Sequence, residues 1–132
     1  MLLTLVILRV NNNFLSTNAS LANSKYKILA VSLATSIIEE ASSKRFDENT
    51  IINPIYDESA LTPKDNLGPD GEVYPNFDDF DDYNMYTFST QNDSSFLSAV
   101  FTGYCTVEYV DTTNLNGSSN IKTWHKKLTV YV

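Results

Sequence analysis

The chain has 132 residues, of which 42% are hydrophobic and 12% aromatic, enough for one folded domain with a modest core. Its net charge is −7, and twelve of its acidic residues lie within residues 47–93 beside a single lysine. A segment this acidic repels phosphates, so the charge pattern excludes nucleic acid as a partner. The only cysteine, Cys105, excludes an intrachain disulfide, and together with the only histidine, His125, it falls short of the four ligands of a usual zinc site.

The first eight residues are mostly apolar and are followed by Arg9. This stretch is too short for a membrane-spanning helix, which needs about 20 apolar residues. It also lacks the basic start and the small-residue cleavage site of a signal peptide. Two interpretations stay open: an ordinary buried helix start, or the C-terminal end of a longer membrane segment.

Residues 14–44 have the pattern of one long helix. Apolar or small side chains recur at spacings of three and four, the helical period, at Leu15, Ala19, Ala22, Tyr26, Leu29, Leu33, Ile37 and Ala41. No glycine or proline occurs before Pro54. Such a helix is about 45 Å long, too long for a small domain to cover, so part of it should meet lipid, another subunit or solvent. We assign residues 1–46 to this N-terminal helix, with residues 1–8 as the end of an apolar membrane or filament-core segment.

Residues 47–95 form an acidic loop region with turn signals at Asn53-Pro54 and Pro69-Asp70-Gly71. Its most distinctive run is residues 77–84, which places four carboxylates within five positions: Asp78, Asp79, Asp81 and Asp82. Carboxylates this close repel one another unless they are solvated or neutralised by a hard cation, so the four are candidate calcium ligands. The alternative is a packed loop, with the aromatic residues turned inward and the aspartates capping backbone amides. The pattern is not that of an EF-hand loop.

Residues 96–132 have the pattern of an antiparallel sheet, with a further short strand expected at residues 86–88. Alternation over residues 96–110 places one set of side chains on a single face: Phe101, Gly103, Cys105, Val107 and Tyr109. A polar hairpin loop follows at residues 111–120. The return strand, residues 121–132, alternates likewise, with Lys126, Leu128, Val130 and Val132 on one face.

These elements predict an α+β fold in which the long helix packs on a three- to four-stranded antiparallel sheet, forming one domain. The helical residues Leu29, Leu33 and Ile37 need an apolar surface, and the inward faces of the two long strands offer one. Glu39 and Glu40 are adjacent on the helix and point apart, so they cannot share a proton or a substrate. No active-site motif is present, and we expect no catalytic residues and no enzyme activity.

Several runs resemble type IV pilin-like proteins. Residues 33–40 followed by Phe46-Asp47-Glu48 are similar to the end of the long helix in that family. Residues 77–84 resemble the "FDD-x-DDYN" element of minor pilins of the mannose-sensitive haemagglutinin type. Residues 107–111 and 126–130 match the sheet strands that follow in such proteins. The resemblance extends over most of the chain, about residues 2–132.

The resemblance implies a pilin-like fold and a structural subunit of an extracellular type IV pilus-like filament or secretion pseudopilus. Its N-terminal helix would pack against copies of itself or related pilins, with the sheet and the acidic loops facing outward. The interface residues would be Leu2, Leu3, Leu5, Val6, Leu8, Leu15 and Ala22. The family's leader, processing site and early glutamate are not in the sequence, so we expect the apolar helix to continue upstream and to anchor the subunit in the inner membrane before assembly. The acidic region motivates an alternative, a calcium-dependent surface adhesion or binding module.

Overall fold

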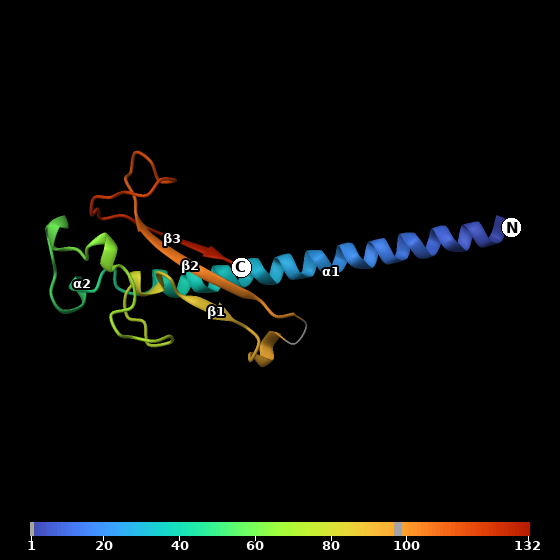
Figure 1. Ribbon diagram of the computed structural model, residues 1–132, viewed down its shortest axis with the longest axis horizontal. Helices are drawn as coiled ribbons and strands as arrows, with labels where there is room; N and C mark the ends of the chain where they lie inside the picture. The colour runs from blue at the N-terminus through green and yellow to red at the C-terminus, as the bar shows by residue number, and fades with distance from the viewer. Residues whose placement is uncertain (1, 97–98) are drawn as a thin grey trace.

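Helix α1 (Leu2–Ser42) projects far beyond the globular part of the molecule in the computed structural model (Figure 1). The structure describes residues 2–96 and 99–132, and the side chains of these residues except 2–8, 10–12 and 52. The 41 residues of α1 give it a length of about 60 Å. Helix α1 includes the residues before Phe14, where the apolar periodicity begins, since the polar run at residues 11–13 interrupts a helix far less than glycine or proline would.

The sheet has three antiparallel strands in the order β1-β2-β3, namely β1 (Thr87–Ser89), β2 (Thr102–Tyr109) and β3 (Lys126–Tyr131). The prediction of an antiparallel sheet is confirmed. Strands β2 and β3 are shorter than predicted. β2 begins at Thr102, opposite the last residue of β1, Ser89, and β3 begins at Lys126, opposite the last residue of β2, Tyr109. Residues 97–98 of the predicted strand lie outside the described residues. The connection between β2 and β3 is correspondingly longer than the predicted hairpin loop.

The alternation of faces in β2 is confirmed. Cys105, Val107 and Tyr109 point into the core, opposite Val130, Leu128 and Lys126 of β3. Both neighbouring strands lie very close to Gly103. A Cβ atom there would lie 2.1 Å from the carbonyl oxygen of Tyr131 and 2.3 Å from Cζ of Phe88, so a side chain would push the strands apart.

Between α1 and β1 the chain forms loops with four short helices, α2 (Asn49–Ile52), η1 (Glu58–Ala60), η2 (Lys64–Asn66) and η3 (Asp81–Tyr83), and η4 (Ser94–Phe96) follows β1. The core has two parts. One joins the C-terminal part of α1 to the sheet, with Ile37, Ala41, Phe77, Tyr83, Cys105 and Val107 buried. The other lies beneath the loops, with Leu61, Leu67 and Tyr109 buried. The predicted α+β class, with the helix packed on the sheet, is confirmed at this level.

Phe101 departs from its predicted role on the helix-facing surface. It lies just before β2, and its ring packs on that of Phe96 at 5.8 Å between centroids. Ile37 is buried in the sheet core and the half-buried Leu33 packs against it, whereas Leu29, also half-buried, lies outside this cluster. Residues 13–28, which we call the projecting segment, are exposed along their whole length. Among the described side chains of α1, those that pack on the sheet therefore lie in its C-terminal third.

Ile37→Asp should destabilise the domain by about 3 kcal/mol or more, because it would bury an unpaired carboxylate between α1 and the sheet. Ile38→Asp is the matched control, since Ile38 is 41% exposed where Ile37 is 8% exposed. The control should change the free energy of unfolding, measured by urea denaturation, by less than about 1 kcal/mol. Equal effects of the two substitutions would contradict the assignment of Ile37 to the core.

Candidate functional site

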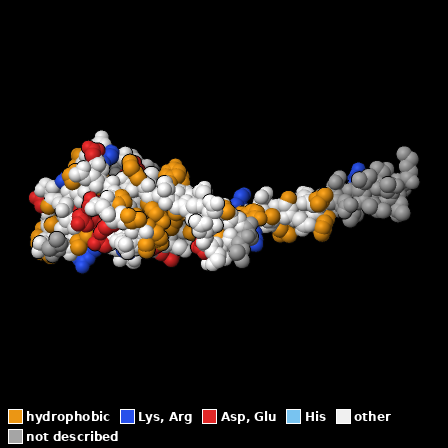
Figure 2. Space-filling view, turned by 60° about the horizontal axis from the view of Figure 1, so that its bottom comes forward, with side chains coloured by type: hydrophobic (Ala, Val, Ile, Leu, Met, Phe, Trp, Pro, Cys, Tyr) orange, Lys and Arg blue, Asp and Glu red, His pale blue; other side chains and the backbone are white. Residues whose placement is uncertain are grey.

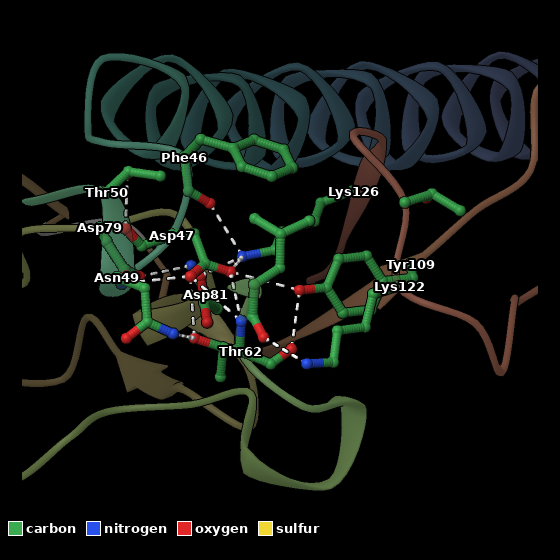
Figure 3. Close-up of polar contacts among 12 residues, drawn as sticks. Phe46, Asp47, Asn49, Thr50, Thr62, Asp79, Asp81, Tyr109, Lys122 and Lys126 are labelled. Atoms are coloured by element: carbon green, nitrogen blue, oxygen red, sulfur yellow. Dashed lines mark hydrogen bonds and ion pairs between the residues drawn. The ribbon is translucent and has the colours of Figure 1, made fainter. Parts of the chain in front are cut away.

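Lys126 is a buried lysine at the start of β3, and its side chain is only 1% exposed. Its ammonium donates hydrogen bonds to the carbonyl oxygen of Phe46 at 2.8 Å, to Asp47 Oδ2 at 2.8 Å, and to Asp81 Oδ1 (Figure 3). All three N–H donors of the ammonium are thus used. From its place in the sheet, the lysine thus contacts two other parts of the molecule: the segment just after α1, and the acidic run.

Two aromatic rings also contact the ammonium of Lys126. We call this group of residues the Lys126 site (Phe46, Asp47, Asp81, Tyr109 and Lys126). The Lys126 Nζ atom lies 4.7 Å from the centroid of the Phe46 ring and 5.4 Å from that of Tyr109. Both distances are within the range of cation–π attraction. The rings also replace water around the ions, which strengthens every charge interaction in the site.

Asp47 is fully buried and accepts hydrogen bonds on both carboxylate oxygens. Its Oδ1 accepts from the backbone amide of Asn49 at 3.1 Å and from the hydroxyl of Thr62 at 2.9 Å. Its Oδ2 accepts from the amide of Thr62 at 3.0 Å as well as from Lys126. Burial by itself raises the pKa of Asp47, but the hydrogen bond and charge of Lys126 and the bonds from Thr62 outweigh it, so the pKa is lowered.

The acidic run is folded around its own backbone amides. Asp79 Oδ1 accepts from the amides of Asp81 at 2.7 Å and Asp82 at 3.1 Å. Asp82 Oδ2 accepts from the amides of Asp78 at 2.9 Å and Asp79 at 3.1 Å. The rings of Phe77 and Tyr83 point into the core. The run therefore has the geometry of the packed loop that was the alternative to a cation site.

Asp79, Asp81 and Asp82 are buried within the subunit. Charge density alone does not predict this, because it does not reveal how many backbone amides are within reach of the carboxylates. Burial, together with the charges of Asp81 and Asp82, raises the pKa of Asp79 to about 8. Burial also raises the pKa of Asp81, against the opposing effect of Lys126.

The four predicted calcium ligands do not converge on one point. Asp81 bonds Lys126 and Asp79 caps amides, while Asp78 and Asp82 lie with Glu72 in a group whose carboxylate oxygens are within 4.8 Å of one another. Glu72 was not among the predicted residues. Burial, the charge of Asp82 and a hydrogen bond with Asp82 raise the pKa of Glu72 to about 7, so a shared proton relieves the repulsion. Calcium binding by this region stays a prediction.

Other predicted residues are placed as follows. Leu15 and Ala22 are exposed on the projecting segment. The side chains of Leu2, Leu3, Leu5, Val6 and Leu8 lie outside the described residues. Cys105 is buried in the core, where burial raises the pKa of its thiol to about 11, so the thiol is held in its unreactive protonated form.

Sequence reasoning missed the Lys126 site, although one signal pointed to it. Lys126 alternates with Leu128 and Val130, which places a lysine on the apolar face of its strand. A lysine is almost never buried without a partner, so this position implies a carboxylate inside the protein. Which carboxylates meet it could not be read from the sequence.

Comparison with known proteins does not assign a function to this chain. The chain matches no protein-family model, no curated protein and no solved structure. Among the described residues, no helix combines the length and apolar character needed to cross a bilayer.

Lys126→Met should destabilise the domain by about 3 kcal/mol or more, because Asp47 and Asp81 would keep buried charge without a cation. Lys127→Met provides the matched control on the neighbouring residue. Lys127 pairs with Glu108 at 3.3 Å, and both side chains are partly exposed, so its loss should cost less than about 1 kcal/mol. Chemical denaturation of both variants tests the difference. Comparable losses in the free energy of unfolding would show that the buried ion pairs of Lys126 matter no more to stability than the exposed pair of Lys127.

Stability should fall as pH rises from 4.5 to about 7, because folded Glu72 keeps a proton that the unfolded chain has released. Asp79 acts in the same direction up to about pH 8. Glu72→Gln should melt like the wild type at the lower end of the Glu72 window and at a higher temperature at its upper end. Glu58→Gln, at an exposed carboxylate, is the control and should follow the wild type. Parallel melting curves of wild type and Glu72→Gln would refute the shared proton.

Proposed function

We propose that this protein is a structural subunit of an extracellular filament, of the type IV pilus-like or secretion pseudopilus kind, that assembles through α1. In this proposal the helices of neighbouring subunits pack together and the globular parts lie outside them. The partners are copies of this chain or related subunits. Before assembly, an apolar segment upstream holds the subunit in the inner membrane.

The observation that carries the proposal is the apolar surface of the projecting segment. Phe14, Leu15 and Leu21 are each 64% exposed, and Ile28 is 69% exposed. Figure 2 shows hydrophobic side chains along this part of the helix, well away from the globular part. A surface of this kind on a helix is costly in water and is covered when other helices surround it.

The arrangement of these residues also fits more than one neighbour. Leu15, Ala19 and Ala22 continue the stripe that packs on the sheet further along α1. Phe14, Leu21 and Ile28 recur every seven residues, about a quarter of a turn from Leu15 and Ala22. Repeats of seven are the spacing at which helices pack side by side. Apolar residues on two sides favour a bundle over a single partner.

Charge is distributed to suit staggered packing. Residues 1–46 carry a net charge of +3, whereas residues 47–93 carry −11. The helix of one subunit can therefore lie beside the acidic loops of another without like-charge repulsion, and such complementarity sets orientation and register more than affinity.

The proposal is tested by recovering the native protein in filaments. Material sheared from the cell surface should contain the chain in thin filaments, as judged by electron microscopy and peptide mass spectrometry. A native protein that stays with the cell contents, with no filaments in the sheared fraction, would overturn the proposal.

Leu15→Asp should keep the thermal stability of the globular part and remove the subunit from filaments, because it would place a charge between packed helices. Ser20→Asp is the matched control, because Ser20 is exposed on the side of the projecting segment away from both apolar sides, and it should assemble like the wild type. The readout is the amount of each variant in the sheared fraction relative to its total. Wild-type incorporation of Leu15→Asp would contradict the interface assignment.

A further inference from the structure

We propose that Lys126 and Asp81 become joined by an amide bond between Nζ of the lysine and Cγ of the aspartate, formed within the folded chain. The two residues are 45 positions apart in the sequence and are in direct contact in the fold. The bond would be a covalent link between β3 and the acidic run. The inference is independent of the filament proposal.

Both side chains of the Lys126–Asp81 contact are closed to water. The side chains of Lys126 and Asp81 are 1% and 2% exposed. The rings of Phe46 and Tyr109 cover the amine. Exclusion of water matters twice: it lowers the cost of the neutral amine and acid relative to the ion pair, and it removes the molecule that would reverse the condensation.

A third group lies beside the acceptor and can carry the proton. Asp79 is buried, and its Oδ1 accepts a hydrogen bond from the backbone amide of Asp81 at 2.7 Å. In the step, a proton passes from the ammonium to the carboxylate, and the Nζ lone pair attacks Cγ of the neutral acid. The C–OH bond then breaks as Asp79 gives its proton to the departing oxygen, and Asp79 takes a proton back from nitrogen. One water leaves, no atom changes oxidation state, and no other reactant is required.

Asp47 also contacts Lys126, at 2.8 Å, but it is a poor acceptor for the amine. Its two oxygens accept bonds from Thr62 and Asn49 in addition to Lys126, and these bonds hold it as a carboxylate. A carboxylate is a weak electrophile. Asp81, with an acid group beside it, is the carboxyl that can be neutral while it faces the amine. The geometry therefore selects Asp81 over Asp47.

The test is the intact mass of the purified, folded full chain. The wild type should be lighter than its sequence by the mass of one water. Trypsin should fail to cut after Lys126 in the unfolded protein, and tandem mass spectrometry should find a branched peptide that joins residues 81 and 126. Lys127→Arg, on the neighbouring side chain, should leave the mass loss unchanged.

Two substitutions of the acceptor make the test specific. Asp81→Ala should have the full mass of its sequence. Asp81→Asn should give the same cross-linked product as the wild type by loss of ammonia, which no non-covalent role of Asp81 predicts. Asp79→Asn should slow bond formation by roughly a hundredfold, the usual contribution of a positioned proton donor.

Three results would overturn the inference. A folded wild-type protein that keeps its full mass on prolonged incubation would exclude the bond. A branched peptide joining Lys126 to Asp47 would refute the choice of acceptor. An unchanged rate in Asp79→Asn would refute its role as the proton carrier.

Discussion

The ammonium of Lys126 fixes how the parts of the globular domain meet. It is bonded at once to Phe46 and Asp47 after α1, and to Asp81 in η3, from its own place at the start of β3. Buried ion pairs often stabilise no better than apolar residues of the same volume, so its main contribution is to specificity. A shift of one residue in β3 would turn Leu128 and Val130 out of the core and bring Thr129 and Tyr131 into it. The observed register of β3 is the one that places Lys126 against the acidic run and these two apolar side chains in the core.

The acidic run has a structural task that its composition conceals. Asp79 and Asp82 accept hydrogen bonds from backbone amides, Asp81 pairs with Lys126, and the aromatic rings of the run pack in the core. The last residue of the run, Asn84, donates to the carbonyl oxygen of Leu67 at 2.8 Å and accepts from the amide of Val107 at 3.0 Å. The motif therefore ties a loop to a central strand, and the strongest sequence signal in the chain reports on packing.

Local periodicity in the sequence was sufficient to predict the main elements. The spacing of Leu33, Ile37 and Ala41 predicted the face of α1 that packs, and alternation in β2 predicted which residues turn inward. Strand ends were predicted less well, since they depend on where a partner stops. The burial of Lys126 could have been inferred from its place on the apolar face of β3, but its partners could not, because Asp47 is 79 positions away and Asp81 is 45. Pairings so distant in sequence follow from the tertiary fold.

Helix α1 is continuous in the structure, but its two parts differ in what stabilises them. Its C-terminal third is held by the core, whereas the projecting segment has only its own backbone bonds and many asparagine, serine and threonine residues, which are mediocre helix formers. An isolated helix of that composition is marginal in water. In the lone subunit this segment should therefore exchange its amide protons with solvent quickly, and become protected when other helices surround it. Association would then include a disorder-to-order transition, and its affinity would depend on temperature through helix formation as well as through contact.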